Sequence, residues 1–395
     1  MKKNLISVLM LALLSMTVFA QTNITEDYYN PLLTGVPSLS VNPDAVGGGM
    51  GDIGASTLPD INSQFWNPSK YALAESHAGF ALSYTPWLRK LVSDIDLAYI
   101  AGYYNISDMA GTLSASLRYF SFGSVNLRES ADAVAISVKP HELAFDLGYA
   151  RKLAEYVSMG VNLRFINSDL SVKDENYYPG YAFSADISAY YLQPFDLPMG
   201  ESKLGIGLNL SNIGTKISYD KGNTRNFLPA NLRFGLSYYL PFNKFNRMSL
   251  SAEINKLMVP SRLSKKAKGF DPNDQDTWAM TPEQYSDIGS MQGIFMSFAD
   301  APGGFKEELK EIMWAVGLEY SYNERFFVRT GYSNENQSKG NRKFFTFGAG
   351  FKLSAFRLDV GYVLAQDQKS ALDNTLRFTL AFDVDGLKDL ADRNK

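Results

Sequence analysis

Apolar residues alternate with small or polar residues along much of this chain, and the alternation runs through unusually long segments. Residues 204–211 read LGIGLNLS and residues 157–165 read VSMGVNLRF. Because successive side chains of a β-strand point to opposite faces, each such segment has one apolar face and one polar face. The sequence therefore predicts a protein built from long strands, each with two chemically different surfaces.

A water-soluble β-sandwich also has alternating strands, but three features favour a membrane barrel. The segments are about 9–13 residues long, whereas ordinary strands centre on ~5–6 residues and a tilted membrane-spanning strand needs ~9–11. Their polar face carries glycine, serine and alanine with single charges such as Arg164 and Arg233, which suits a crowded barrel interior. Short and long connections alternate, as they do in outer-membrane proteins.

The predicted fold class is therefore all-β: a 14-stranded antiparallel transmembrane β-barrel over residues 78–382. An even number of strands places both ends of the barrel in the periplasm. Aromatic pairs near segment ends, such as Tyr103-Tyr104, fit the aromatic girdles of such barrels, although ordinary β-propensity explains part of them. The predicted strands are 78–87, 92–104, 110–126, 141–151, 155–168, 180–193, 202–213, 228–240, 247–258, 311–322, 325–335, 342–352, 355–365 and 373–382.

The two ends of the chain lie outside this plan. In residues 1–20, two lysines precede an apolar stretch, and residues 18–20 (VFA) have the small-x-small form of a signal-peptidase site, so we expect a removed signal peptide and a mature protein that begins at Gln21. The alternative is a membrane anchor, but the apolar stretch of about 15 residues is shorter than the ~20 that cross a bilayer as a helix. The charged residues 383–395 are expected to form a frayed periplasmic tail.

The composition excludes several classes of function. The chain has no cysteine, which excludes a lipoprotein anchor, disulfides and thiolate metal sites. A net charge of −3 provides no basic field for nucleic acid. The histidines at 77 and 141 fit a structural role better than a metal site, no G-x-S-x-G motif is present, and acidic pairs such as Glu307/Glu308 fit solvated surface charge. We therefore expect no cofactor and no enzymatic activity.

Residues 21–77 do not alternate and form a segment of a different kind. A glycine-rich loop can cradle phosphate, but the GxGxxG spacing and the P-loop lysine are missing. We expect instead a compact hatch, or plug, in the periplasmic mouth of the barrel, where glycine permits a tight backbone and Asn-Pro ends it. Its first motif, at 47–52 (GGGMGD), contains Gly49, Met50, Gly51 and Asp52, and its second, at 62–68 (NSQFWNP), contains Trp66, Asn67 and Pro68.

These motifs resemble the PorV family, also called LptO, of outer-membrane proteins in the Bacteroidetes type IX secretion system. The similarity lies in residues 42–45 (NPDA), 49–55 (GMGDIGA) and 59–72 (PDINSQFWNPSKYA), and it continues at 145–151 (FDLGYAR) and in the strand count. PorV is in turn similar to the FadL transporters, which have fourteen strands and an N-terminal hatch with an Asn-Pro-Ala signature. Here that signature reads Asn67-Pro68-Ser69, which departs at its third position.

The resemblance implies an interaction protein of the cell outer membrane. It would bind the C-terminal signal domains of secreted cargo as they leave the type IX translocon, and it would deliver them to the attachment complex, whose sortase cleaves the signal. Outer-membrane lipids would be its other partner. The alternative is a FadL-type transporter of hydrophobic small molecules, which needs an apolar pocket, whereas the inward faces read as glycine, serine, asparagine and scattered charge. An enzyme acting on lipopolysaccharide has no paired nucleophile and base to support it.

Two external loops are candidates for partner binding, because function on a barrel frame falls to its loops. The first is expected to put exposed apolar groups beside cations, as partner surfaces do, although an interfacial tryptophan belt explains its tryptophan equally well. Its residues are Trp87, Leu88, Arg89 and Leu91. The long loop over 259–310 carries apolar residues that either fold inward as a lid or bind a partner. We favour partner binding, through Trp278, Met280, Met291, Phe295 and Phe298.

Overall fold

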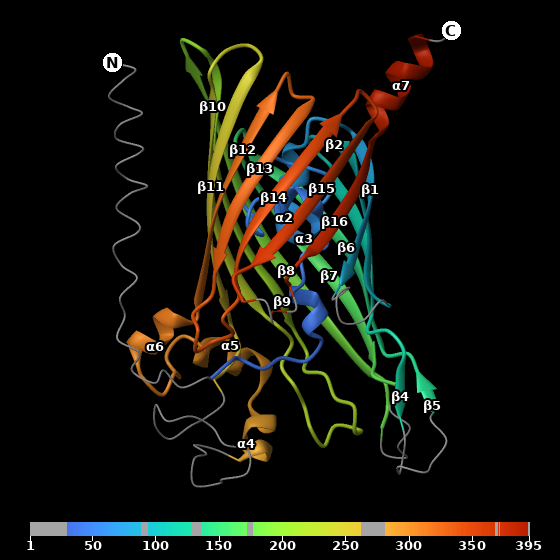
Figure 1. Cartoon of the computed structure of the whole chain (residues 1–395), viewed down its shortest axis with the longest axis vertical. Helices are drawn as coiled ribbons and strands as arrows, with labels where there is room; N and C mark the ends of the chain where they lie inside the picture. The colour runs from blue at the N-terminus through green and yellow to red at the C-terminus, as the bar shows by residue number, and fades with distance from the viewer. Residues whose placement is uncertain are drawn as a thin grey trace.

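Fourteen antiparallel strands close into one barrel in the computed structural model (Figure 1). The structure describes residues 30–87, 94–127, 136–171, 177–261, 281–367, 370 and 372–393. The first and last strands close the barrel, with Gly79 opposite Asp383 and Tyr84 opposite Phe378. The predicted fold class is confirmed. The barrel strands are β1 (Ala78–Trp87), β2 (Ile95–Ser107), β3 (Gly111–Ser121), β6 (His141–Ala154), β7 (Val157–Asp169), β8 (Gly180–Leu197), β9 (Gly200–Gly214), β10 (Asn231–Pro241), β11 (Asn246–Leu257), β12 (Ile312–Tyr322), β13 (Phe326–Asn334), β14 (Lys343–Lys352), β15 (Phe356–Ala365) and β16 (Thr375–Asp383).

The third strand predicted from the sequence, over 110–126, is too long. β3 ends at Ser121, and a separate hairpin follows, in which β4 (Val125–Leu127) pairs with β5 (Ile136–Val138). The chain changes direction at Gly123, whose φ of 77° is left-handed and is adopted by glycine without strain. The hairpin extends beyond the barrel wall in Figure 1.

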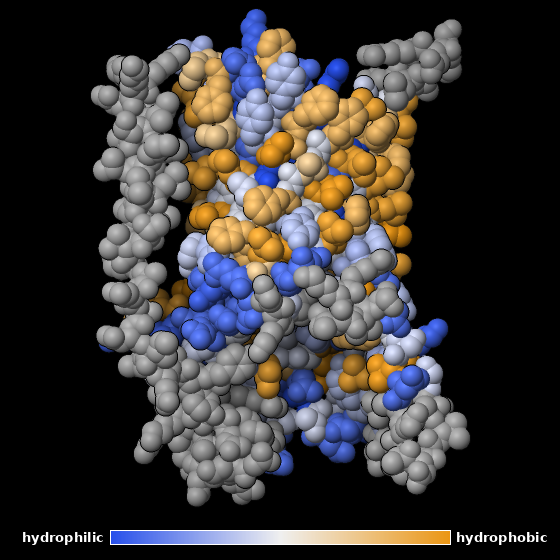
Figure 2. Space-filling view, in the orientation of Figure 1, coloured by the Kyte–Doolittle hydropathy of each residue, from blue (hydrophilic) through white to orange (hydrophobic). Residues whose placement is uncertain are grey.

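The barrel is apolar outside and polar inside. In β1, Phe80, Leu82 and Tyr84 are exposed, whereas Ser83 and Thr85 are buried. Figure 2 shows hydrophobic side chains over the middle of one face of the barrel, with hydrophilic side chains toward both ends. This order is the reverse of a water-soluble protein and is the one that a bilayer selects. Among the described helices, none combines the length and the apolar character of a membrane-crossing helix.

Connections of two lengths distinguish the two ends of the barrel. At one end the strands are joined by turns of a few residues, such as residues 155–156 between β6 and β7. The other end carries the longer loops, one of which contains α4 (Pro282–Asp287), α5 (Ser290–Met296) and α6 (Phe305–Lys310). Outer-membrane barrels have short periplasmic turns and long external loops, so the turn end is the periplasmic end and the loop end is the external end.

A hatch, described from residue 30 to residue 77, fills the barrel (Figure 1). At the external end the Asn30 N–H donates to the Ser338 carbonyl at 2.7 Å. At the periplasmic end the Tyr71 ring stacks on Tyr103 with 4.7 Å between centroids. The expectation of a plug confined to the periplasmic mouth is therefore wrong, because the hatch runs the length of the lumen. Its short helices are η1 (Pro37–Ser40), α2 (Ala45–Gly48), α3 (Ser63–Trp66) and η2 (Pro68–Leu73).

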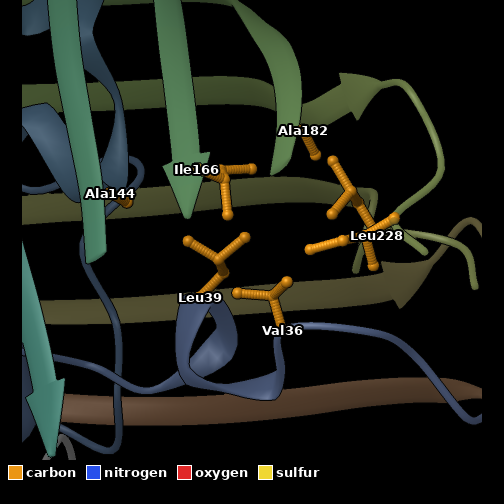
Figure 3. Packing of buried hydrophobic residues seen from close by; sticks show 7 residues of the cluster. Val36, Leu39, Ala144, Ile166, Ala182 and Leu228 are labelled. Carbon is orange, nitrogen blue, oxygen red and sulfur yellow. The ribbon is translucent and has the colours of Figure 1, made fainter. Parts of the chain in front are cut away.

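Apolar packing fixes the external part of the hatch to the wall. Val36 and Leu39, at η1, point toward Ile166 of β7 and Leu228 in Figure 3, and all four side chains are buried. Ile166 occupies an inward position of β7, so the polar inner face of this strand becomes apolar where η1 meets it. Dispersion and burial thus help to hold the external part of the hatch, beside the hydrogen bonds that Arg118 and Glu142 make to Ser38.

The described part of the C-terminal tail is a helix, so the expectation of a frayed segment is wrong. Helix α7 (Val384–Arg393) follows β16 directly. The Asp385 carboxylate accepts a hydrogen bond from the His77 backbone N–H at 2.7 Å. Hydrogen bonds from His77, the backbone N–H first, lower the pKa of Asp385 to about 2. The tail is thereby attached to the residues that lead into β1.

Candidate functional site

The glycine-rich part of the hatch packs against the ring of Trp66. A Cβ on Gly47 would lie 2.4 Å from an atom of that ring, and one on Gly54 would lie 2.2 Å from it. Glycine is therefore required for the backbone to lie on the indole. The Asp44 carboxylate accepts hydrogen bonds from the N–H groups of Val46 (2.7 Å) and Gly47 (2.9 Å) and from the indole Nε1–H. The motif builds a packed core around a buried tryptophan.

The second hatch motif forms a turn that is bonded to the wall. The Asn67 side-chain NH₂ donates to the carbonyls of Ala55 in the hatch and Ala189 in β8, both at 3.0 Å. Its Oδ1 accepts from the Ser69 N–H at 3.2 Å. Pro68 is the first residue of η2, where a missing N–H breaks no helical hydrogen bond. The Asn67-Pro68-Ser69 signature thus caps η2 and ties it to β8.

Polar side chains of the wall hold the hatch from several sides of the barrel. The Arg377 guanidinium contacts the Asp52 carboxylate at 2.6 Å. Glu253 accepts hydrogen bonds from the N–H groups of Gly54 and Ala55 at 3.0 and 2.8 Å. Buried charges and N–H groups are tolerated only when they are paired in this way. Other wall side chains that bond the hatch include Arg118, Glu142, Asn209, Tyr239, Thr346 and Thr379.

Glycines on the inner face of the wall bring the two backbones into contact. A Cβ on Gly207 of β9 would lie 1.9 Å from the Ala55 carbonyl oxygen, and one on Gly331 of β13 would lie 2.2 Å from the Met50 carbonyl carbon. No side chain fits between the backbones at these positions. At seven more inward glycines an added Cβ would lie 3.0 Å or less from a hatch atom: Gly79, Gly148, Gly160, Gly205, Gly235, Gly317 and Gly348.

The hatch separates two cavities in the lumen. The external cavity has a volume of about 520 Å³ and meets the hatch at Phe65 and Trp66. The periplasmic cavity has a volume of about 390 Å³ and meets it at Met50 and Leu58. Within the described residues, none lines both cavities. A solute that crossed the barrel would therefore need the hatch to move.

The external cavity combines ion pairs with an apolar patch. Arg164 contacts Asp146 at 2.7 Å and Asp186 at 3.0 Å, so these charges satisfy one another within the wall. The apolar patch belongs to a cluster that includes Phe344 and Leu372 at the rim. The described side chains contain no group of three or more acidic or histidine residues that could hold a metal ion.

The predicted loop residues divide into three groups. Trp87 is only 8% exposed and packs edge-on against Phe120 at 6.1 Å, so the expectation of an exposed tryptophan is wrong. Trp87 occupies an inward position of β1, so its ring packs into the apolar cluster at the rim. Met291, Phe295 and Phe298 are exposed, as expected of a contact surface. Leu88, Arg89, Leu91, Trp278 and Met280 lie outside the described residues.

The long loop also contains inward-facing residues, as the lid alternative expects, whereas partner binding by this loop stays a prediction. Tyr285 and Ile288 are buried against Phe227 and Val259. Lys216 Nζ donates to the carbonyls of Tyr285, Ser286 and Ile288 at 3.2, 3.0 and 2.8 Å, at the end of α4. Burial lowers the pKa of Lys216 to about 8. This part of the loop is anchored at the external mouth.

The sequence reasoning missed the surface formed by α6. Glu308 is buried and contacts Lys256 at 3.1 Å, and Glu307 contacts Lys339 at 2.6 Å. The expectation that this acidic pair is solvated is therefore wrong. Phe305, on the same helix, is exposed although it is a large apolar residue. A helical spacing that places the acids on one side and the apolar residues on the other is the signal that could have identified this surface.

A half-buried aspartate in the same loop titrates near neutral pH. The Asp300 carboxylate accepts a hydrogen bond from the Ser261 N–H at 2.8 Å. Burial, together with the nearby carboxylates of Glu311 and Glu308, raises the pKa of Asp300 to about 7 from its ordinary value of 3.8. Between pH 3.8 and about pH 7 the folded loop therefore keeps a proton on Asp300 that the unfolded chain has released. Its stability should fall as the pH rises through this window, with the full penalty present above about pH 7.

We expect Asp300→Asn to remove this pH dependence. Asparagine can still accept the Ser261 hydrogen bond and carries no charge to desolvate. Protection factors for amide hydrogen exchange in residues 281–310 should be higher at about pH 5.5 than at about pH 7.5 in the parent protein, and nearly equal in the variant. Lys216, whose pKa is lowered to about 8, is present in both proteins and therefore contributes equally to their pH dependence. An unchanged pH slope in the variant would assign the effect to another group.

A hatch-sealed outer-membrane β-barrel is the class of protein that this fold and lumen define. Residues 24–264, more than half of the chain, match the family described as type IX secretion system protein PorV. The chain belongs to this family, and its membership supports a role in type IX secretion. No curated protein sequence matches the chain.

Solved structures resemble this chain at low sequence identity. The toluene transporter TodX of Pseudomonas putida has a TM-score of 0.50 and 12% identity, over 86% of this chain and 97% of that chain. A Pseudomonas aeruginosa FadL homologue (TM-score 0.45, 11% identity) is matched over 90% of this chain and 99% of that chain. The toluene transporter TbuX of Ralstonia pickettii (TM-score 0.44, 13% identity) is matched over 86% and 97%. The likeness to TodX shows a common fold alone.

Proposed function

We propose that this barrel is a carrier for cargo of the type IX secretion system. It binds the C-terminal signal domains of cargo as they leave the translocon and delivers them to the attachment complex, where a sortase cleaves the signal. The external loops make the contacts. The proposal is supported by membership of the PorV family and by a lumen that the hatch divides into two cavities.

The sealed lumen is the observation that favours a carrier over a channel. The hatch is bonded to the wall by charged groups such as Arg377 and Glu253 and is seated on inward glycines such as Gly207. A folded protein domain is far larger than either cavity, so cargo must be held at the external surface. The barrel then serves as a membrane-embedded frame that displays its loops.

Deletion of the gene in the native host tests the proposal directly. Cargo should retain its C-terminal signal and should be missing from the cell surface, and the parent gene on a plasmid should restore both. Mature, surface-attached cargo in the deletion strain would overturn the proposal. If cargo processing is normal but uptake of a hydrophobic compound is lost, the FadL-type alternative replaces it.

Site-specific photocrosslinking tests where the cargo binds. Val125 lies in the external β4–β5 hairpin and is 40% exposed, whereas Met109 lies in a periplasmic turn and is 83% exposed. A photoreactive residue at 125 should crosslink to cargo that carries its signal domain and not to cargo that lacks it. The same residue at 109 is the matched control. Equal crosslinking at both positions would contradict binding at the external loops.

A further inference from the structure

One lysine at the external end points toward the lipid side of the wall and is nevertheless buried. In β11, Glu253 faces the lumen, where it bonds the hatch, while Ile254 faces out and is 46% exposed. Because side chains alternate, Lys256 shares the outer face of Ile254. Its side chain is nevertheless only 9% exposed. Something on the outside of the barrel must therefore cover it.

The cover is α6. Lys256 Nζ contacts the carboxylates of Glu308 at 3.1 Å and Glu311 at 2.6 Å, and both of these side chains are buried. Lys339, from the β13–β14 connection, contacts Glu307 at 2.6 Å and closes the network. An unpaired outward lysine in this zone would have to be solvated or neutralised. Helix α6 therefore lies against the outer side of the wall, with its acidic face inward.

The opposite face of α6 is exposed within the described part of the chain and carries two large apolar residues beside Lys306 and Lys310. Phe305 is 75% exposed and Leu309 is 50% exposed, and the two are one helical turn apart. A helix on a water-soluble surface has the reverse order, with apolar residues inward and charges outward. The inverted order of α6 is the same as that of the barrel wall, which is polar inside and apolar outside.

Helix α5 lies on the same outer side. Its buried residue Ile294 packs against Leu210 of β9 and Leu232 of β10. Both leucines are outward positions, because their neighbours Asn209 and Arg233 face the lumen. The α5 residues Met291 and Phe295 and the following Phe298 are exposed at 53%, 71% and 47%. The two helices thus add a second apolar layer outside the wall.

We propose that α5 and α6 form a lipid-binding collar that inserts its apolar face into the external leaflet of the outer membrane. The collar is continuous with the lipid-facing belt. Ile254, two residues before Lys256, pairs with Trp314 of β12, and both side chains point outward and are exposed. Exposed Lys306 stands next to Phe305, where it can meet the phosphates of lipid headgroups. This inference does not depend on the cargo-carrier proposal.

Quenching by brominated lipid tests the collar in the purified full-length protein. Phe305→Trp and Phe295→Trp variants are reconstituted into phosphatidylcholine vesicles, with and without bromine on the acyl chains near the interface. Leu163→Trp is the lipid-facing control, at a position 66% exposed in the middle of β7, and Met109→Trp is the water-facing control. The parent protein gives the background of its own tryptophans, and iodide reports access from water.

Bromolipid should quench the tryptophans at 305 and 295 to at least half the extent seen at 163, and iodide should quench them less than the tryptophan at 109. Strong iodide quenching with no bromolipid quenching would overturn the proposal and leave a water-facing partner surface. Protection from both quenchers would also overturn it, because a second copy or another protein would then cover the collar. Since no cargo is present, the result is independent of the deletion and crosslinking experiments.

Discussion

Gly207→Ala should unseat the hatch and destabilise the barrel by roughly 1–3 kcal/mol or more. The added Cβ would lie 1.9 Å from the Ala55 carbonyl oxygen, and this neighbour is backbone, which cannot rotate away as a side chain can. Displacement of Ala55 would also strain the hydrogen bonds that Glu253 and Asn67 make to the same segment. Of the substitutions considered, this one has the largest expected effect on the seal of the lumen.

The measurements are the urea midpoint of the refolded barrel in vesicles and the uptake of a large antibiotic by cells that carry the variant. The midpoint should fall and uptake should rise. Gly102→Ala is the matched control, because Gly102 is a wall glycine on the outward side of β2 whose close neighbours are strand residues Gly79 and Phe80 rather than the hatch. An intact seal and an unchanged midpoint in Gly207→Ala would mean that the hatch is not seated as described.

Arg164→Ala should destabilise the barrel by roughly 3–5 kcal/mol. Arg164 contacts Asp146 and Asp186 at 2.7 and 3.0 Å, and all three side chains are at most 8% exposed. Truncation leaves two carboxylates buried beside each other without a cation, and the cost of an uncompensated buried charge exceeds the value of the pair itself. Asn212, which accepts a hydrogen bond from the same guanidinium, loses its partner as well.

Urea unfolding in vesicles measures this effect, with Arg247→Ala as the control. Arg247 pairs with Glu324 at the periplasmic end, where both side chains are largely exposed, so its loss should change stability by only ~0–1 kcal/mol. Equal destabilisation by the two substitutions would show that water in the lumen screens the Arg164 cluster, and the description of a buried, paired network would fail.

The barrel could be predicted from the sequence because its signal is local. Alternation such as that in residues 204–211 reports which face of a strand meets lipid, and it requires no knowledge of the neighbouring strand. Connection lengths then order the strands, and the hatch motif around Trp66 and Asn67 points to the family. The predicted and observed strands agree closely, apart from the break after Ser121, where a glycine turn interrupts an otherwise strand-like stretch.

Contacts between distant parts of the chain decide the path of the hatch and whether individual loop residues are buried or exposed. In the sequence Lys256 is an isolated charge on an apolar face. In the structure α6 places Glu308 and Glu311, which lie more than 50 residues further along the chain, over it. Trp87 reads as exposed until the barrel closes and turns its ring toward Phe120. The sequence by itself determined the alternation, and therefore which solvent each face of the wall requires. Only the tertiary structure decided which buried charges find partners, because pairing depends on distances across the barrel that no local pattern contains.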